Sequence, residues 1–223
     1  MAFSFNKRAF LNCEIITRRL ISWEELEALQ ESLKAKVLEN RNQVYFLLSE
    51  PLPTFTFGKQ ADPSDLLWTP ELLEANQVKV AQVDRGGQWT YHGPGQLLCY
   101  PIASLETLGF GSKSARSFVD LLRTSVQKAC AEMGCLSQPE DEPFGLFVGN
   151  QKLASFGMSF QGGVSSHGVA LYVTPQKFFF EGIHPCGQKR FQATSLQENI
   201  PHLSWSDAAA SLIRFLEKGF KIS

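Results

Sequence analysis

The stretch from residue 85 to residue 96, Arg-Gly-Gly-Gln-Trp-Thr-Tyr-His-Gly-Pro-Gly-Gln, is the most informative part of the sequence for the fold. It joins two strand-like runs, residues 78–83 and 96–102, and its four glycines and one proline are typical of a loop rather than a helix. Successive strands without a helix between them favour a mixed sheet over a regular βαβ repeat.

The rest of the chain supports the same fold class. Further strand-like runs cover residues 44–48, 54–57, 144–148, 152–160 and 168–173. Three amphipathic helices are expected: one after the capping-box sequence that starts at Ser22, one over residues 113–133, and one after Ser206. We predict an α/β fold with a mixed α+β sheet, in a single domain over residues 1–223. The acidic segment 139–143, between two prolines, is expected to be an exposed loop.

Composition excludes several classes of protein. The 223 residues are 43% hydrophobic, and 21 basic and 22 acidic side chains leave a net charge of −1. Such a chain is neither disordered nor suited to binding nucleic acid or an anionic membrane through its total charge. A membrane-spanning helix needs roughly 20 apolar residues in a row, and the longest runs here are much shorter. We expect no nucleic-acid partner and no membrane association.

The five cysteines, Cys13, Cys99, Cys130, Cys135 and Cys186, are scattered and form no CxxC pair. This pattern is a poor disulfide framework and a poor zinc site, so we expect no bound metal and a reducing, cytoplasmic location.

Chemistry is expected first in the glycine-rich loop. Glycines let the backbone approach a ligand and expose its N–H groups, and Arg85 adds a planar cation. The glycine spacing fits neither a Walker loop nor a dinucleotide fingerprint. The alternative is a structural turn in which His92 is satisfied by hydrogen bonds.

The second candidate is Cys186, which lies in a turn between a proline and a glycine. A thiol titrates near pH 8.5, so a nucleophilic cysteine needs a base or a positive charge nearby. The candidates are His92, His167, His184 and Lys152. His167 could point into a site or lie on the surface, and the neighbour His184 is interpreted as incidental. Lys152 could be a solvated strand end or a buried amine with a lowered pKa.

Taken together, four segments resemble the octanoyltransferases of the lipoate pathway. They are residues 85–96 with Tyr-Pro at 100–101; residues 152–157, Lys-Leu-Ala-Ser-Phe-Gly; residues 166–171, Ser-His-Gly-Val-Ala-Leu; and the Pro-Cys-Gly turn at 185–187 with Thr-Ser-Leu at 194–196. They occur in the family's order. The resemblance implies the fold of the catalytic domain of biotin and lipoate protein ligases, and a reaction without cofactors. It also implies octanoyl-acyl carrier protein as donor, and lipoyl domains of 2-oxoacid dehydrogenases and the glycine cleavage H protein as acceptors.

The resemblance also assigns roles. Cys186 would accept the acyl group, and Lys152 would lower the pKa of the thiol and shuttle protons. One departure is visible: Tyr172 stands where the family commonly has asparagine, which affects the expected chain-length preference. The residues expected to contact the substrate are Arg85, Gly86, Gly87, Gln88, Trp89, Thr90, Tyr91, His92, Ser155, Phe156, Gly157, Gly168, Val169 and Ala170.

Three other functions remain open at this point. An ATP-dependent lipoate or biotin ligase would share the fold without needing the cysteine. A cysteine hydrolase would pair Cys186 with His184 or His167 and use water as acceptor. A binding module would keep the pocket without turnover.

Overall fold

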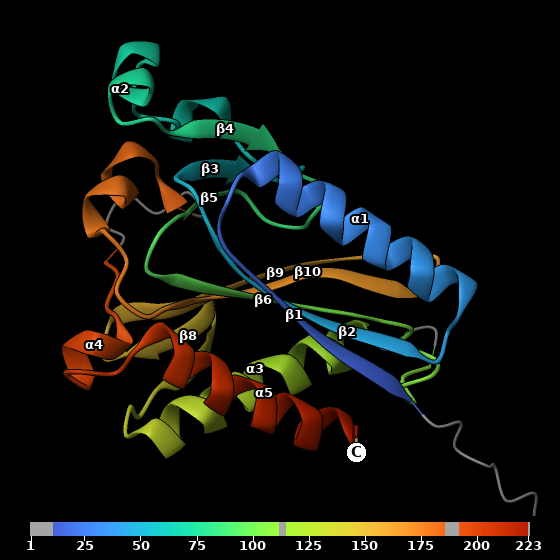
Figure 1. The fold of residues 1–223 in the computed structure, drawn as a ribbon. Helices are drawn as coiled ribbons and strands as arrows, with labels where there is room; N and C mark the ends of the chain where they lie inside the picture. The colour runs from blue at the N-terminus through green and yellow to red at the C-terminus, as the bar shows by residue number, and fades with distance from the viewer. Residues whose placement is uncertain (1–10, 112–114, 186–191, 223) are drawn as a thin grey trace, which may run out of the picture.

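The computed structural model describes residues 11–111, 115–185 and 192–222, and Figure 1 shows that they form three layers. A seven-stranded sheet lies in the middle, in the order β1-β2-β6-β10-β9-β8-β7. Its strands are β1 (Asn12–Ile21), β2 (Gln43–Pro51), β6 (Gln96–Ala103), β7 (Gln138–Asp141), β8 (Phe144–Val148), β9 (Gln151–Gln161) and β10 (Val164–Tyr172). Strands β1 and β2 are parallel, whereas every other neighbouring pair is antiparallel. The prediction of a mixed α/β fold is therefore confirmed.

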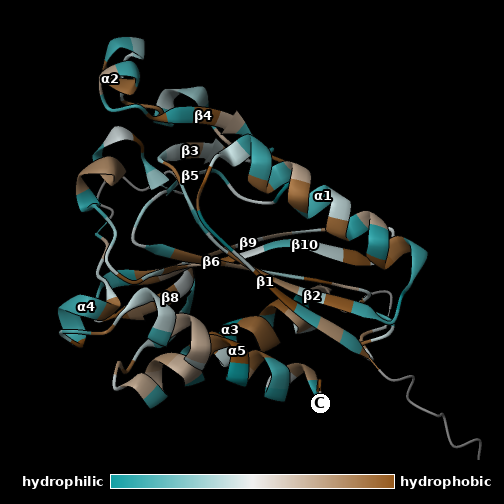
Figure 2. Ribbon diagram, in the orientation of Figure 1, coloured by the Kyte–Doolittle hydropathy of each residue, from teal (hydrophilic) through white to brown (hydrophobic). Residues whose placement is uncertain are grey.

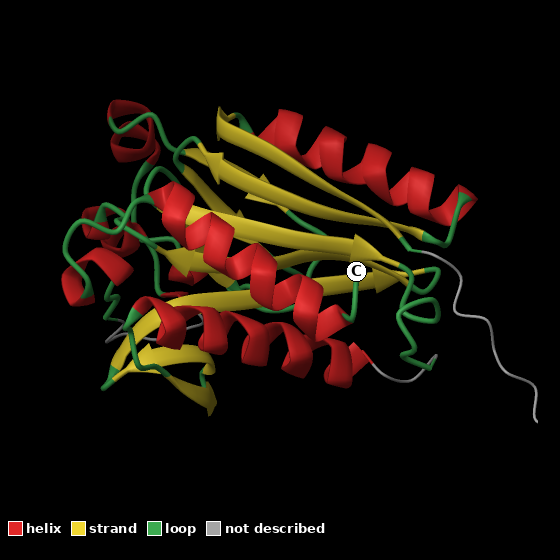
Figure 3. Cartoon of the chain, turned by 60° about the horizontal axis from the view of Figure 1, so that its bottom comes forward, coloured by secondary structure: helices red, strands yellow, loops and turns green. Residues whose placement is uncertain are grey.

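Helices and a smaller sheet cover the two faces of the large sheet. Helix α1 (Trp23–Glu39) and a three-stranded sheet of β4 (Lys79–Gln82), β3 (Thr54–Phe57) and β5 (Trp89–His92) lie on one side, with α2 (Pro70–Ala75) beyond them. Helices α3 (Ala115–Met133) and α5 (Trp205–Phe220) pack against each other on the other side (Figure 3). Short connections contain η1 (Pro63–Asp65), η2 (Lys177–Gly182) and α4 (Leu196–Asn199).

Two hydrophobic cores follow from this layering. One lies between the large sheet and helices α3 and α5, and includes Phe46, Phe118 and Leu212. The other lies between the same sheet, α1 and the small sheet, and includes Tyr45 and Phe55. Figure 2 shows hydrophobic residues along the central strands and a mixture of hydrophilic and hydrophobic residues along α1. The central strands β2, β6 and β10 are buried along their whole length, because both of their faces are covered.

Helices α1 and α5 both begin with a capping box. Ser22 caps α1 through a capping box with Glu25, as predicted. The helix predicted after Ser206 is α5, which begins one residue before Ser206. It is capped by Ser204, whose hydroxyl accepts from the backbone of Asp207 while the Asp207 carboxylate accepts from Ser204.

Three strands were not predicted, and the predicted exposed loop at 139–143 is exposed but forms a strand in part. Residues 139–143 do not form a loop throughout: β7 pairs with β8 and ends the sheet. Strand β1 forms the opposite edge, and most of its side chains are exposed. Edge strands tolerate charged residues and proline because one side of the strand needs no hydrogen-bonding partner. Strand β5 lies inside the glycine-rich stretch, which was predicted to be a loop because of its glycines.

The described residues contain no helix that is long and apolar enough to cross a membrane. Four of the cysteines, Cys13, Cys99, Cys130 and Cys135, are free thiols. Cys186 lies outside the described residues. In the described ranges, no group of three or more histidine, cysteine or acidic side chains could hold a metal ion.

Candidate active site

A pocket of about 520 Å³, including its open mouth, lies where the glycine-rich loop meets the large sheet. It brings together three segments that the sequence had singled out, together with Lys152. The lining residues are Arg85, Gly86, Gly87, Gln88, Trp89, Thr90, His92, Tyr100, Phe144, Lys152, Ser155, Phe156, Gly157, His167, Gly168, Val169 and Ala170. Strands β9 and β10 place two of the segments side by side, because Gly157 pairs with Gly168.

The loop before β5 is held by Arg85, which is itself buried. One guanidinium nitrogen donates to the hydroxyl of Thr56 at 2.8 Å and to its carbonyl at 3.2 Å, and another donates to the carbonyl of Gly86 at 3.0 Å. The side chain passes against Gly157, where an added Cβ would lie 3.0 Å from the Arg85 Cδ. The arginine therefore ties this wall of the pocket to the small sheet.

Tyr91 is the one predicted binding residue that does not line the pocket. Its ring stacks on Phe179 at 4.8 Å and meets Phe55 and Phe180 edge-on. Successive residues of a strand point to opposite faces, so Tyr91 points away from the side on which Thr90 and His92 lie. It belongs to the core beneath the small sheet.

Two histidines at the pocket are buried and weakly basic. His92 stacks on Trp23 at 5.2 Å, and burial, reinforced by the charge of Arg85, lowers its pKa to about 3. His167 meets Tyr100 edge-on, and burial followed by the charges of Arg85 and Lys34 lowers its pKa to about 4. The surface alternative for His167 was therefore wrong. Both rings are neutral near pH 7 and are poor proton acceptors.

Lys152, near the start of β9, is 1% exposed, so the alternative of a solvated strand end was wrong. Its Nζ donates to the carbonyl of Phe144 at 3.2 Å and lies 5.3 Å from the centre of the Phe147 ring. Its backbone bonds to Gln192 and Thr194, which places residues 192–194 beside it. A buried amine held in this way can exchange protons with a nearby group.

The β9 and β10 wall combines polar and apolar groups. The hydroxyls of Ser155 and Tyr172 form a 2.7 Å hydrogen bond, so the family departure at residue 172 reaches the pocket through Ser155. Phe156 meets Phe144 edge-on at 5.8 Å. An added Cβ at Gly168 would overlap the carbonyl of Cys99, so the close approach of β6 requires glycine there.

One predicted histidine lies outside the pocket, and two aromatic residues that were not predicted line it. His184 bonds to Asp65 through its backbone at 2.8 Å and through its ring at 3.3 Å, and it is not among the residues that line the pocket. Phe144 and Tyr100 line the pocket without having been proposed as binding residues. Phe144 gave no sequence signal beyond opening a strand, whereas Tyr100 belongs, with Pro101, to the segments on which the family resemblance was based.

Comparison with known proteins gives consistent relatives. The family model for the lipoyl protein ligase A/B catalytic domain matches residues 24–217. A Hahella chejuensis protein named octanoyltransferase is 34% identical over 198 residues, covering 87% of this chain and 84% of its own. A Geobacter sp. protein of the same name is 37% identical over 177 residues, covering 79% and 81%.

Solved structures agree on the fold. A putative lipoate protein ligase from T. acidophilum with bound lipoic acid superposes with a TM-score of 0.78 at 12% identity, covering 96% of this chain and 88% of that one. Biotin protein ligase from Aquifex aeolicus gives 0.53, again at 12% identity, covering 95% and 71%. The chain belongs to the lipoyl protein ligase A/B catalytic domain family.

Proposed function

We propose that this protein is an octanoyltransferase that moves an octanoyl group, through a thioester on Cys186, onto a lysine of a lipoyl domain. The observation that carries the proposal is the buried amine of Lys152, which lines a pocket whose walls also include Phe144, Phe156 and Val169. An apolar wall beside a fixed proton acceptor suits an acyl chain whose carbonyl reacts at one end.

The reaction consists of two acyl transfers. In the first, the Cys186 thiol gives its proton to Lys152 and attacks the carbonyl of the octanoyl thioester. The bond to the carrier sulfur breaks, and Lys152 passes the proton to that sulfur, so the carrier leaves as a thiol and the Lys152 amine is neutral again. In the second, the acceptor lysine attacks the enzyme thioester, an amide forms, and Cys186 leaves as a thiolate. Lys152 removes a proton from the acceptor amine and returns one to the thiolate. The first step exchanges one thioester for another, so no nucleotide is needed to drive it.

The partners follow from this chemistry. The donor is an octanoyl thioester, which we assign to octanoyl-acyl carrier protein. The acceptors are lipoyl domains, which we assign to the 2-oxoacid dehydrogenases and the glycine cleavage H protein. The four described cysteines are unpaired, which supports a reducing, cytoplasmic location. We take residues 1–223 as one catalytic domain.

Two alternatives are less well supported. The relatives named octanoyltransferase are 31–37% identical to this chain, whereas the lipoate and biotin ligase structures are 10–13% identical and match through the fold. A Cys–His hydrolase would need a basic imidazole. His167 has a pKa lowered to about 4 by burial, and His184 is not among the described residues that line the pocket.

A transfer assay without nucleotide tests the proposal. Purified protein is mixed with octanoyl-loaded acyl carrier protein and an unmodified lipoyl domain, and the lipoyl domain is weighed by mass spectrometry. We expect the octanoyl amide to form without ATP. Cys186→Ser and Lys152→Met should each lower the rate by at least about a hundredfold. The matched control, Cys13→Ser, alters a half-buried thiol of β1 and should match the wild type. Transfer that requires ATP would establish a ligase instead.

A further inference from the structure

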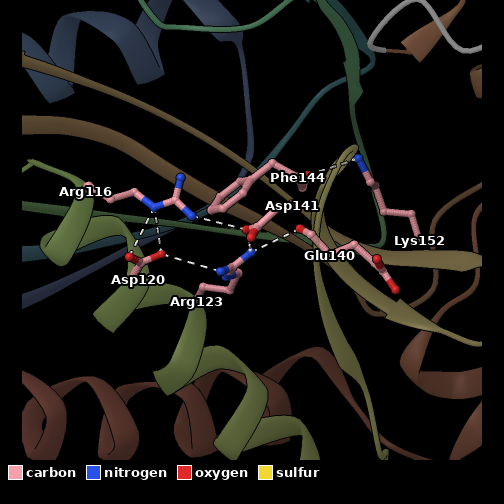
Figure 4. Close-up of polar contacts among 7 residues, drawn as sticks. All are labelled: Arg116, Asp120, Arg123, Glu140, Asp141, Phe144 and Lys152. Atoms are coloured by element: carbon pink, nitrogen blue, oxygen red, sulfur yellow. Dashed lines mark hydrogen bonds and ion pairs between the residues drawn. The ribbon is translucent and has the colours of Figure 1, made fainter.

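A cluster of charged residues lies directly outside the pocket wall, on the side of Phe144 that faces α3. Figure 4 shows Arg116, Asp120 and Arg123 reaching from α3 toward Phe144 and Asp141. The guanidinium carbon of Arg123 lies 4.4 Å from the centre of the Phe144 ring, and that of Arg116 lies 5.5 Å from it. The ring of a pocket residue is thus covered by two cations from a neighbouring helix.

The two arginines are not equivalent. The side chain of Arg123 is 13% exposed, whereas that of Arg116 is 65% exposed. Arg123 donates to the carbonyl of Glu140 at 3.0 Å and to the carboxylate of Asp141 at 2.8 Å. The hydrogen bond from Arg123 is also the largest cause of the lowered pKa of Asp141. Arg123 therefore fixes the end of β7, just before the chain turns into β8, and covers the first residue of β8.

Phe144 links this cluster to the amine. Its carbonyl accepts the hydrogen bond from Lys152 Nζ at 3.2 Å, while its ring packs edge-on against Phe156. The next residue, Gly145, leaves little space: an added Cβ would lie 2.9 Å from the Cε of Lys152. A small displacement of this strand start is therefore transmitted to the lysine side chain, because the packing leaves no gap to absorb it.

We propose that Arg123 is a positioning residue for acyl transfer. It holds Phe144 from outside the pocket, and through the Phe144 carbonyl it sets the position of the Lys152 amine. Arg123 does not touch the substrate itself. The proposal rests on the proposed function, because it assumes that Lys152 is the group that moves protons.

The test compares steady-state kinetics of Arg123→Met with the wild type, with kcat counted per molecule able to form the octanoyl adduct. Methionine keeps much of the apolar stem but removes the cation and its hydrogen bonds to Glu140, Asp141 and Asp120. We expect kcat to fall about tenfold while KM for donor and acceptor stays within about twofold, since the proton acceptor is displaced while every side chain that lines the pocket is kept. Arg123→Lys keeps a cation over the ring and should recover part of the loss.

A double-mutant cycle shows whether Arg123 acts through Phe144. Phe144→Leu keeps the backbone carbonyl but removes the ring. If the ring is the link, adding Arg123→Met to Phe144→Leu should lower kcat less than it does in the wild-type background. Fully additive losses in kcat would overturn the proposal, as would a wild-type kcat in Arg123→Met. The matched control is Arg214→Met. It breaks the surface ion pair between Arg214 on α5 and Glu132 on α3, and it should leave kcat unchanged.

Failure of this proposal differs from failure of the proposed function. If Lys152→Met stays active, the assumed role of Lys152 is wrong and the proposal for Arg123 falls with it. If Lys152→Met is inactive and Arg123→Met behaves as the wild type, only the proposal for Arg123 is overturned.

Discussion

Gly157→Ala tests how tightly the pocket wall is packed. Gly157 lies on β9 opposite Gly168, and Arg85 crosses directly above it. An added methyl group would lie 3.0 Å from the Arg85 Cδ and 3.7 Å from its Nε. Ordinary carbon–carbon contacts are about 3.5–4.0 Å, so the side chain must move by about 0.5–1 Å.

The cost of that movement follows from what holds Arg85. Its hydrogen bonds to the Thr56 hydroxyl and carbonyl and to the Gly86 carbonyl, at 2.8 to 3.2 Å, would be stretched. Weakening one hydrogen bond from a charged donor, together with overpacking, should lower the free energy of unfolding by about 1–3 kcal/mol. At about 2–4 °C per kcal/mol for a domain of this size, Tm should fall by about 2–12 °C. A shift of the pocket loop by up to about 1 Å should slow acyl transfer by about ten- to a hundredfold.

The assay is octanoyl transfer to a lipoyl domain, measured together with thermal unfolding. The comparison variant is Gly86→Ala, the same chemical change on the facing loop, where the nearest described atom to the added Cβ is the carbonyl oxygen of Met158 at 4.0 Å. Its loss of activity should be about tenfold smaller than that of Gly157→Ala. Equal effects from the two substitutions, or a wild-type rate and Tm for Gly157→Ala, would refute the packing argument.

Three further predictions concern pH, chain length and the sheet. The pKa values of His92 and His167 are lowered to about 3 and about 4, so both rings bind protons more readily in the unfolded chain. The free energy of unfolding should therefore fall below about pH 6.5, by up to about 1.4 kcal/mol per pH unit for each ring. In His167→Gln, the free energy of unfolding, measured by urea unfolding, should change less steeply with pH between pH 7 and about pH 5. The same pH dependence as in the wild type would contradict this. A hexanoyl donor buries two fewer CH₂ groups, about 1.6 kcal/mol, so its kcat/KM should be about fifteenfold lower. Equal values for the two donors would argue against an apolar acyl site. Gly168→Ala places a methyl group against the Cys99 carbonyl and should prevent folding, as seen in the yield of folded protein. A folded variant with a wild-type Tm would show that β6 and β10 can separate.

Sequence patterns predicted the central elements better than the edges. Runs such as residues 54–57 and 144–148 coincide with β3 and β8, because both runs are rich in aromatic and β-branched residues, which favour strands. Strands β1 and β7 were missed because most of their side chains face solvent and carry no periodic apolar signal. Only the pairing with a neighbouring strand defines them as strands.

Some residues of the site could be predicted from the sequence, whereas others could not. The glycine-rich loop and the segments at 155–157 and 168–170 could be selected from the sequence because they combine unusual residues in a known order, and the fold gathers them at one pocket. The burial of Lys152 and the neutrality of His167 could not be read from composition, since both depend on packing from distant segments. The contact between Phe144 and Lys152 could not be predicted from the sequence, because Phe144 accepts the hydrogen bond through its backbone carbonyl, a group that every residue has.

The central claim, that the octanoyl group passes through Cys186, is tested most directly by mass spectrometry. The protein is incubated with octanoyl-loaded acyl carrier protein in the absence of a lipoyl domain, its intact mass is recorded, and the modified peptide is mapped. We predict one octanoyl adduct, located on Cys186 and lost when a lipoyl domain is added. An adduct confined to any of the other four cysteines, or no adduct under conditions that support transfer, would contradict the account.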